Sequence, residues 1–404
     1  MQPALPRRTK TGNAMPSTSK AVSHLSPNAH MLGQQGSAQA LNTPVLVLDL
    51  DAFDRNLERM MDHCKASGLG LRPHAKTHKS VEIARRQMDA GAVGVCVAKL
   101  GEAEVMGEGG IESVLITSPV VKEDGIRRLM ELNGRISDLM VTIDSLANAQ
   151  ALARASSPEQ GGARHLKVIV DLDVGLHRTG IAPGEGAAEL AEFVAASPGL
   201  KFSGLQAYAG HLMHVEDYAE RREKSLDAMK QLGDMRDMLR ERNISCDILT
   251  GGGTGSWDID PDAGVLTDLQ AGSYLFMDTE YNAVAQKDGP EQAFETSLTI
   301  QTTVVSANTP GIATTDAGIK SMATDQKAFA IASGAPDGTA YFLFGDEQGG
   351  LAFPDADTGL APGSVLNLET PHCDPTVNLY DCYHVVKDGT LVDIWPVSTR
   401  GRSA

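Results

Sequence analysis

The feature that most constrains the fold is a repeated alternation of short apolar runs and amphipathic stretches between residues 69 and 271. Helical stretches such as residues 80–90 and 216–242 separate most of these runs. The eight runs with strand character are residues 69–73, 93–97, 113–117, 139–143, 166–173, 202–207, 246–250 and 269–271. Eight such βα units predict a closed (β/α)8 barrel over residues 51–290, with a doubly wound open sheet as the alternative.

Two segments fall outside this pattern. An apolar strand at residues 45–50 precedes the eight runs, and Asp51 is expected to cap the helix that follows it. From residue 291 to residue 404 the chain shows strands joined by turns, without long helices, which predicts an antiparallel β domain. Its expected strands are residues 298–305, 327–332, 340–344, 364–368, 377–386 and 390–397. We expect the segment 43–50 to pair with this domain.

The first 42 residues differ from the rest because they contain Arg7, Arg8, Lys10 and Lys20 but no acidic residue. We interpret residues 1–42 as a disordered extension or a misassigned start, with a transit peptide as the alternative. No apolar stretch follows the two arginines, which argues against a secretory signal.

Charge and cysteine content limit the class of function. The chain of 404 residues has a formal net charge of −17, which argues against binding to nucleic acid or to anionic membranes. No apolar run approaches the roughly 20 residues of a membrane span. Five cysteines, an odd and sparse number, favour a reducing compartment. We expect a cytoplasmic protein, with organellar import through residues 1–42 as the alternative.

Glycine-rich turns follow the seventh and eighth runs. Residues 251–256 read Gly-Gly-Gly-Thr-Gly-Ser, and residues 272–274 read Gly-Ser-Tyr. Glycines let backbone N–H groups approach an anion, and barrels often bind phosphate after these two strands. We therefore predict a phosphate pocket, with a flexible glycine hinge as the alternative. The predicted contacts are Gly252, Gly253, Thr254, Gly255, Ser256, Gly272, Ser273 and Tyr274.

Lys76 follows the first run within the sequence His-Ala-Lys-Thr-His. A partly desolvated lysine beside cationic groups can have a lowered pKa and form a Schiff base, although a surface lysine is the alternative. Together with a phosphate pocket at the same rim, Lys76 predicts pyridoxal phosphate as the cofactor.

Two more residues at this rim are candidates. Arg178 is expected to contact the phenolic oxygen of the cofactor, with an ion pair to Asp171 or Asp173 as the alternative. Tyr208 is expected to pack within the site, with a place in the core as the alternative.

The tripeptide His372-Cys373-Asp374 in the β domain is a weak metal motif by itself. If the segment is extended, His372 and Asp374 point to one side and Cys373 to the other. An imidazole and a carboxylate with open positions suit an ion such as Mn²⁺, whereas Cys373 as a ligand would favour zinc. Two ordinary polar residues at a strand end are the alternative.

Taken together, these motifs resemble the fold type III pyridoxal-phosphate enzymes, and within them the D-threonine aldolase and D-serine dehydratase group. The resemblance covers about residues 43–403. It includes Thr43-Pro44, the Arg-Pro-His-Ala-Lys sequence at residues 72–76 and the glycine loop 251–256. It also includes residues 269–274 (Leu-Gln-Ala-Gly-Ser-Tyr) and residues 372–376 (His-Cys-Asp-Pro-Thr).

The resemblance implies roles for individual residues and a homodimer. It implies that Lys76 holds pyridoxal phosphate and that Arg178 approaches the phenolic oxygen. The glycine loop, Ser273 and Tyr274 match the phosphate site. His372 and Asp374 match the metal pair, with Mn²⁺ expected and Mg²⁺ or Zn²⁺ as alternatives. His214 matches a histidine that acts as base on the β-hydroxyl of the substrate.

The implied activity is that of a low-specificity D-threonine aldolase, which cleaves D-3-hydroxy amino acids to glycine and an aldehyde. The alternatives are a 3-hydroxy-D-aspartate aldolase and a dehydratase of D-serine or a related amino acid. Asp374 favours the aldolase, because the dehydratases of this group have His-x-Cys at the metal. Gln348, Tyr380 and His211 depart from the usual pattern and leave the substrate preference open. A non-catalytic cofactor carrier would need neither a β domain nor a metal pair.

Overall fold

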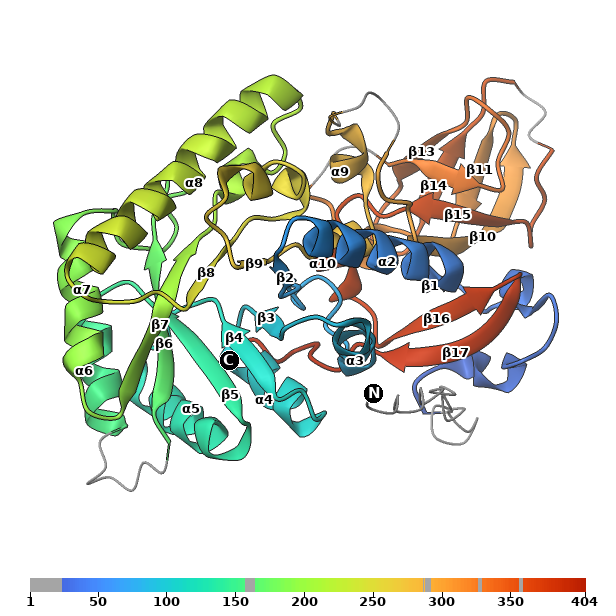
Figure 1. The fold of residues 1–404 in the computed structure, drawn as a ribbon. Coiled ribbons are helices and arrows are strands. Elements are labelled where there is room, and N and C mark those ends of the chain that lie inside the picture. The colour runs from blue at the N-terminus through green and yellow to red at the C-terminus, as the bar shows by residue number, and fades with distance from the viewer. Residues whose placement is uncertain (1–23, 157–163, 286, 288–291, 326–328, 356–358) are drawn as a thin grey trace, which may run out of the picture.

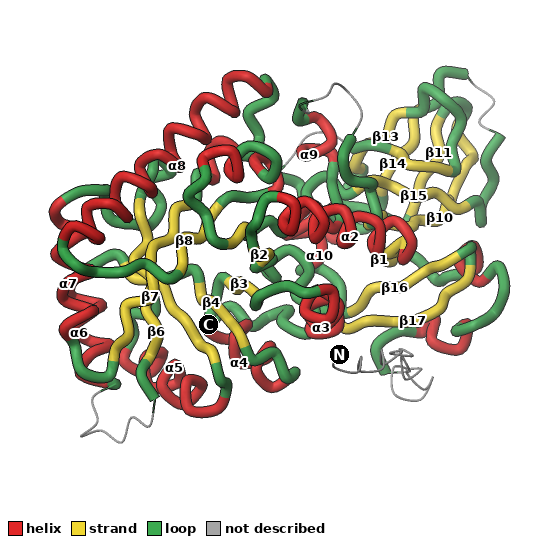
Figure 2. The backbone as a smooth tube through the Cα atoms, in the orientation of Figure 1, coloured by secondary structure: helices red, strands yellow, loops and turns green. Residues whose placement is uncertain are grey.

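The structure is a computed structural model that describes residues 24–156, 164–285, 287, 292–325, 329–355 and 359–404. A barrel and a sheet domain lie side by side, and the helix α2 (Leu50–Ala66) runs between them (Figure 1). Figure 2 shows helices around the outside of the barrel strands and few helices over the second sheet.

Eight parallel strands form the barrel in the order β2-β9-β8-β7-β6-β5-β4-β3. The two end strands also meet, because His74 and Cys96 form a parallel bridge and the amide of Val93 donates to the carbonyl of Leu71 at 2.8 Å. The strands are β2 (Gly70–Leu71), β3 (Val95–Val97), β4 (Ser113–Ile116), β5 (Asp138–Ile143), β6 (Leu166–Leu172), β7 (Leu200–Ala207), β8 (Ile248–Gly251) and β9 (Asp268–Leu269). The predicted (β/α)8 barrel is confirmed, and the open sheet is excluded.

Helices pack outside these strands because each has an apolar face. In α2 the side chains of Phe53, Leu57 and Met60 are buried. Its cap differs from the prediction: Asp49, and not Asp51, accepts the amide of Ala52 at 2.9 Å. The other helices are α3 (Val81–Ala90), α4 (Leu100–Glu108), α5 (Glu123–Arg135), α6 (Leu146–Ala155), α7 (Glu185–Ala196), α8 (Tyr218–Glu241) and α9 (Thr279–Ala283).

The inside of the barrel is filled with side chains. Cys96, Leu115, Met140 and Ile169, from four successive strands, form a fully buried apolar cluster. Polar side chains lie in the same interior. The side-chain amide of Gln270 donates hydrogen bonds to the side chains of Gln206 and Thr250. The barrel is therefore a packed core whose strand ends carry the rim residues.

The second domain is a nine-stranded sheet that includes the N-terminal strand β1 (Val45–Asp49). β1 pairs antiparallel with β10 and parallel with β16, so it joins the two ends of the chain. The other strands are β10 (Leu298–Thr309), β11 (Ile312–Thr315), β12 (Ile331–Ser333), β13 (Ala340–Leu343), β14 (Gly349–Ala352), β15 (Val365–Glu369), β16 (Cys382–Lys387) and β17 (Thr390–Pro396).

Parts of this sheet differ from the expectation. The strand expected at residues 377–386 begins only at Cys382, because the short helix α10 (Cys373–Val377) and a turn precede it. β11 and β14 were not foreseen. Part of the strand expected at 327–332 lies outside the described residues.

The segment from residue 24 to residue 42 packs on the β domain, so the predicted disordered tail does not extend to residue 42. Ala29 and Leu41 bury their side chains against β1, β16 and β17. The hydroxyl of Ser26 lies 2.8 Å from Nε2 of the buried His384. These apolar and polar contacts are long-range and leave no periodic signal in the sequence. Residues 1–23 lie outside the described residues.

Within the described part of the chain, no helix has the length and apolar character needed to cross a membrane.

Candidate active site

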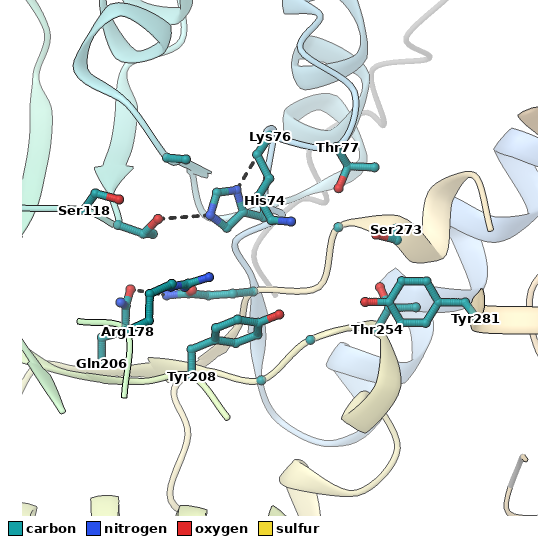
Figure 3. A pocket seen from close by; sticks show the side chains of 16 residues that line it. His74, Lys76, Thr77, Ser118, Arg178, Gln206, Tyr208, Thr254, Ser273 and Tyr281 are labelled. Carbon is teal, nitrogen blue, oxygen red and sulfur yellow. Dashed lines mark hydrogen bonds between the residues drawn. The ribbon is translucent and has the colours of Figure 1, made fainter. Parts of the chain in front are cut away.

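A cavity of about 260 Å³ opens at the C-terminal ends of the barrel strands (Figure 3). Residues that follow seven of the eight strands line it, and Tyr281 of α9 lines it from the link to the β domain. The lining residues are His74, Lys76, Thr77, Ala98, Thr117, Ser118, Arg178, Gln206, Tyr208, Gly252, Gly253, Thr254, Gln270, Gly272, Ser273 and Tyr281. The barrel therefore brings residues that are nearly 200 positions apart into one cavity.

Lys76 reaches this cavity because the segment after β2 continues along the barrel wall. The amide of His74 donates to the carbonyl of Ala271 at 3.2 Å, and that of Ala75 donates to Cys96 at 2.7 Å. The ammonium of Lys76 pairs with the carboxylate of Asp374 from the β domain. Asp374 raises the pKa of Lys76, which is opposite in direction to the lowered pKa that cationic neighbours can cause.

His74 supports the lysine segment from inside the cavity. Its Nδ1 accepts the amide of Lys76 at 3.3 Å, and its Nε2 lies 3.0 Å from the hydroxyl of Thr117. Burial, with the nearby Lys76 charge, holds the pKa of His74 well below its ordinary value. A neutral ring that accepts at Nδ1 carries its proton on Nε2 and donates it to Thr117.

Glycines form a cradle on the opposite wall. Gly252 has φ +69°, and a Cβ there would meet the side chains of Leu269 and Asp260 at 2.6 and 2.7 Å. A Cβ on Gly272 would meet Oγ1 of Thr77 at 2.7 Å and the carbonyl oxygen of His74 at 2.9 Å. The backbone is thus exposed where side chains have no room, and the hydroxyl-bearing residues Thr254 and Ser273 adjoin it. Such a wall can hold a phosphate group.

Three of the predicted phosphate contacts, Gly255, Ser256 and Tyr274, are not among the residues that line this cavity. The hydroxyl of Ser256 is fully buried and donates to Asp260 at 2.6 Å. A Cβ on Gly255 would meet the carbonyl oxygen of Met213 at 2.1 Å, and the hydroxyl of Tyr274 lies 3.4 Å from Gln87 in the core. The side chains of Ser256 and Tyr274 are hydrogen-bonded within the protein, and the backbone of Gly255 packs closely against that of Met213.

Arg178 and Tyr208 lie together at the cavity. The guanidinium carbon of Arg178 is 5.6 Å from the centre of the Tyr208 ring. The two carboxylates considered as its partners are occupied by others: Asp171 accepts Gln206 at 2.8 Å, and Asp173 lies 2.7 Å from Nδ1 of His177. Among the described residues, neither carboxylate forms an ion pair with Arg178, which lines the cavity.

His372 and Asp374 lie beside the cavity at the start of α10. The segment is not extended through both residues, because His372 caps α10 and Asp374 lies in its first turn. Asp278 holds this turn by accepting the amide of Cys373 at 2.9 Å. Burial opposes the ionisation of Asp374, but the Lys76 ammonium keeps the pKa of Asp374 below its usual range.

His372 and Asp374 are the two candidate ligands for a divalent ion at this place. No group of three or more His, Cys, Asp or Glu residues with metal-binding geometry occurs among the described residues. The carboxylate of Asp374, whose side chain is 14% exposed, pairs with the ammonium of Lys76. An imidazole and an ionised carboxylate fit an ion with open coordination positions. Cys373 is buried and its thiol lies 3.4 Å from Asp374.

His214 lies on the same side of the cavity. Its ring centre is 4.6 Å from that of the cavity residue Tyr281, and its Nε2 is 3.9 Å from the carboxylate of Glu280. Burial lowers the pKa of His214, so its imidazole is neutral near pH 7. A neutral, partly buried imidazole can accept a proton.

The sequence interpretation missed several lining residues. Gln206 lies in β7 two residues before the rim residue Tyr208, so strand alternation could have indicated it. His74 was not predicted as a site residue, although it lies two residues before Lys76 in the same motif. Thr117 and Ser118 follow β4 without a distinctive pattern, and Tyr281 belongs to a connection between the domains.

Comparisons with known proteins agree with this architecture. The family model of the alanine racemase N-terminal domain matches residues 48–280, and that of a putative serine dehydratase domain matches residues 297–386. The D-threonine aldolase of Arthrobacter sp. is 40% identical over 363 residues, which cover 90% of this chain and 94% of the relative. The 3-hydroxy-D-aspartate aldolase of Paracoccus denitrificans is 36% identical over 371 residues, which cover 90% of this chain and 93% of the relative.

A solved structure is similar as well. The crystal structure of the D-threonine aldolase from Filomicrobium marinum has a TM-score of 0.85 and 35% sequence identity. The match covers 91% of this chain and 97% of that structure. The predicted family resemblance is confirmed.

Proposed function

The chain belongs to the family of the alanine racemase N-terminal domain, and on this premise we propose that it is a pyridoxal-phosphate-dependent aldolase. It cleaves D-3-hydroxy amino acids, such as D-threonine, to glycine and an aldehyde. The observation that carries this proposal is the contact between the cavity lysine, Lys76, and Asp374 of the β domain. This ion pair places a lysine that can bind an aldehyde beside a carboxylate that can bind a metal ion. Two similar relatives are named as aldolases of this substrate class.

The cofactor binds between Lys76 and the glycine wall. The amine of Lys76 would hold the cofactor through its aldehyde, with the aldehyde oxygen leaving as water, and the backbone of Gly252, Gly253 and Gly272 would hold its phosphate with the hydroxyls of Thr254 and Ser273. Arg178 approaches the phenolic oxygen, and Tyr208 lies beneath the guanidinium. When bound, pyridoxal phosphate supplies an electron sink for the carbanion that carbon–carbon cleavage leaves.

A divalent ion, Mn²⁺ in this proposal, binds to His372 and Asp374. When bound, such an ion supplies Lewis acidity toward the β-hydroxyl of the substrate. His214 takes the proton of that hydroxyl, and desolvation of its imidazole lowers its pKa. Asp278 contributes by holding the turn that presents the two ligands.

The charges around the histidines favour an uncharged β-substituent. Glu280 lies 3.9 Å from His214, and Asp325 lies 2.6 Å from His372. A substrate with a second carboxylate, such as 3-hydroxy-D-aspartate, would place a further negative charge near the carboxylates of Glu280 and Asp325, where it would be repelled. D-Threonine therefore ranks ahead of 3-hydroxy-D-aspartate as the substrate.

Two further properties belong to this proposal. A homodimer is expected from the family resemblance. The five cysteines are free in the structure, which supports the expected reducing cytoplasm.

The experiment compares the wild-type protein with Lys76→Ala and with the control Lys201→Ala, an exposed lysine of β7 that pairs with Asp247. Each is incubated with pyridoxal phosphate, Mn²⁺ and either D-threonine or 3-hydroxy-D-aspartate, and glycine is quantified. We expect Lys76→Ala to lose both the visible absorbance of the bound cofactor and the release of glycine, whereas Lys201→Ala retains both. Glycine release by Lys76→Ala at the wild-type rate would refute the role of this lysine.

A further inference from the structure

The ring of His372 has a carboxylate partner that no sequence motif indicated. Nδ1 of His372 lies 2.6 Å from Oδ2 of Asp325. Asp325 is in the connection between the 3₁₀ turn at Ile319–Ser321 and β12, far from His372 in sequence. The side chain of His372 is 28% exposed and that of Asp325 is 49% exposed. The contact is therefore made at the surface of the cavity region and not in the core.

The chemistry of this contact fixes the position of one proton. An ionised carboxylate can only accept a hydrogen bond, so the shared proton belongs to Nδ1 of the imidazole. In the neutral ring the lone pair is then on Nε2. A metal ion binds to the lone pair of an imidazole and not to the protonated nitrogen. Asp325 thus selects the nitrogen of His372 that is available to an ion.

Among the described residues, the other carboxylates near His372 form no hydrogen bond to its imidazole. Asp374 pairs with Lys76, and Asp278 accepts the amides of Cys373 and Tyr281. The carboxylate of Glu280 comes no closer to His214 than 3.9 Å, which is too long for a hydrogen bond. Among the described residues, Asp325 is the partner that hydrogen-bonds to the imidazole of His372.

We propose that Asp325 is a positioning residue for the metal site, which orients His372 through its Nδ1–H and leaves Nε2 for the ion. This inference rests on the proposed function, because the ion is the divalent ion proposed to bind His372 and Asp374. Carboxylates that accept the second N–H of a ligating histidine typically strengthen metal binding by about 10- to 100-fold. Asp325 would contact neither cofactor nor ion, so its effect passes through His372.

The first test measures Mn²⁺ binding directly, by the electron paramagnetic resonance signal of the free ion, on protein loaded with pyridoxal phosphate. Asp325→Asn is expected to weaken binding by roughly 10- to 100-fold, and Asp325→Glu to restore part of it. Glu280→Gln is the matched control, because it removes one negative charge from the same region without a bond to His372. The cofactor absorbance should stay unchanged in all three variants. Equal Mn²⁺ affinities for Asp325→Asn and the wild type, or an equal loss in Glu280→Gln, would overturn the proposal.

The second test needs neither metal nor turnover. Protein with ¹⁵N-labelled histidine, free of metal, is examined by NMR, with His372→Gln to assign the ring. We expect His372 to carry its proton on Nδ1 in the wild type and to lose this preference in Asp325→Asn. A wild-type ring protonated on Nε2 would contradict the proposal. If the protein proved inactive on D-threonine, the proposed function would fail, while these two results would still decide the role of Asp325.

Discussion

The replacement Gly272→Ala tests whether the glycine wall is shaped for a cofactor. The new Cβ would lie 2.7 Å from Oγ1 of Thr77 and 2.9 Å from the carbonyl oxygen of His74, and 3.4 Å from Cβ of His74. Normal contact is roughly 0.5 Å longer than the two short distances, so the segment that carries Lys76 must move by about that amount. Overpacking of this kind costs about 1–3 kcal/mol.

That cost should appear in cofactor binding, because the strained segment carries the lysine that binds it. At about 1.4 kcal/mol per factor of ten, we expect roughly 10- to 100-fold weaker binding of pyridoxal phosphate. The assay is a titration of the cofactor-free protein, followed by visible absorbance. Gly345→Ala is the control, since no atom lies within 4 Å of its Cβ position. Wild-type affinity in a folded Gly272→Ala protein would show that the wall does not constrain the cofactor.

Three other predictions follow from single contacts. His214→Asn should lower glycine release by roughly 100-fold or more with the cofactor absorbance unchanged, and full activity would remove His214 from the proton step. Asp49→Ala removes the cap of α2 and should reduce the free energy of unfolding in urea by ~1 kcal/mol without changing turnover; no loss would mean that the 2.9 Å contact is unimportant. Burial lowers the pKa of His384 from 6.5 to about 4, so the neutral ring stabilises the fold above pH 6.5 and this stability is lost as the pH falls toward 4. At pH 5 the free energy of unfolding should be ~2 kcal/mol lower than at pH 7, and this difference should be smaller in His384→Gln. An equal difference in this variant would assign the acid sensitivity to other groups.

Local patterns were sufficient to predict the barrel. Each strand is a short apolar run, each helix has an apolar face, and both signals are contained within about 15 residues. The chemistry at the rim was readable for the same reason, since Lys76, Arg178 and the glycine loop follow predicted strands directly. Asp51 was predicted to cap α2, but Asp49 is its N-cap. The sequence alone does not distinguish them, because aspartate is a favourable N-cap residue at either position.

The remaining features depend on contacts between distant segments. The packing of residues 24–42 on the β domain includes a hydrogen bond to His384, which is more than 300 positions away. Asp325 lies 47 positions before His372, and nothing in the intervening sequence indicates their contact. The pKa of Lys76 was expected to be lowered, since the sequence shows cationic neighbours, whereas its actual partner, Asp374, comes from the other domain.

The reaction itself is decided most directly by its products. Purified protein is incubated with D-threonine, pyridoxal phosphate and Mn²⁺, with and without EDTA, and the products are identified. The account predicts glycine and acetaldehyde in equal amounts, formed only when the chelator is absent. Ammonia and 2-oxobutyrate would instead show a dehydratase, and they would contradict the assignment of His372 and Asp374 to an aldolase.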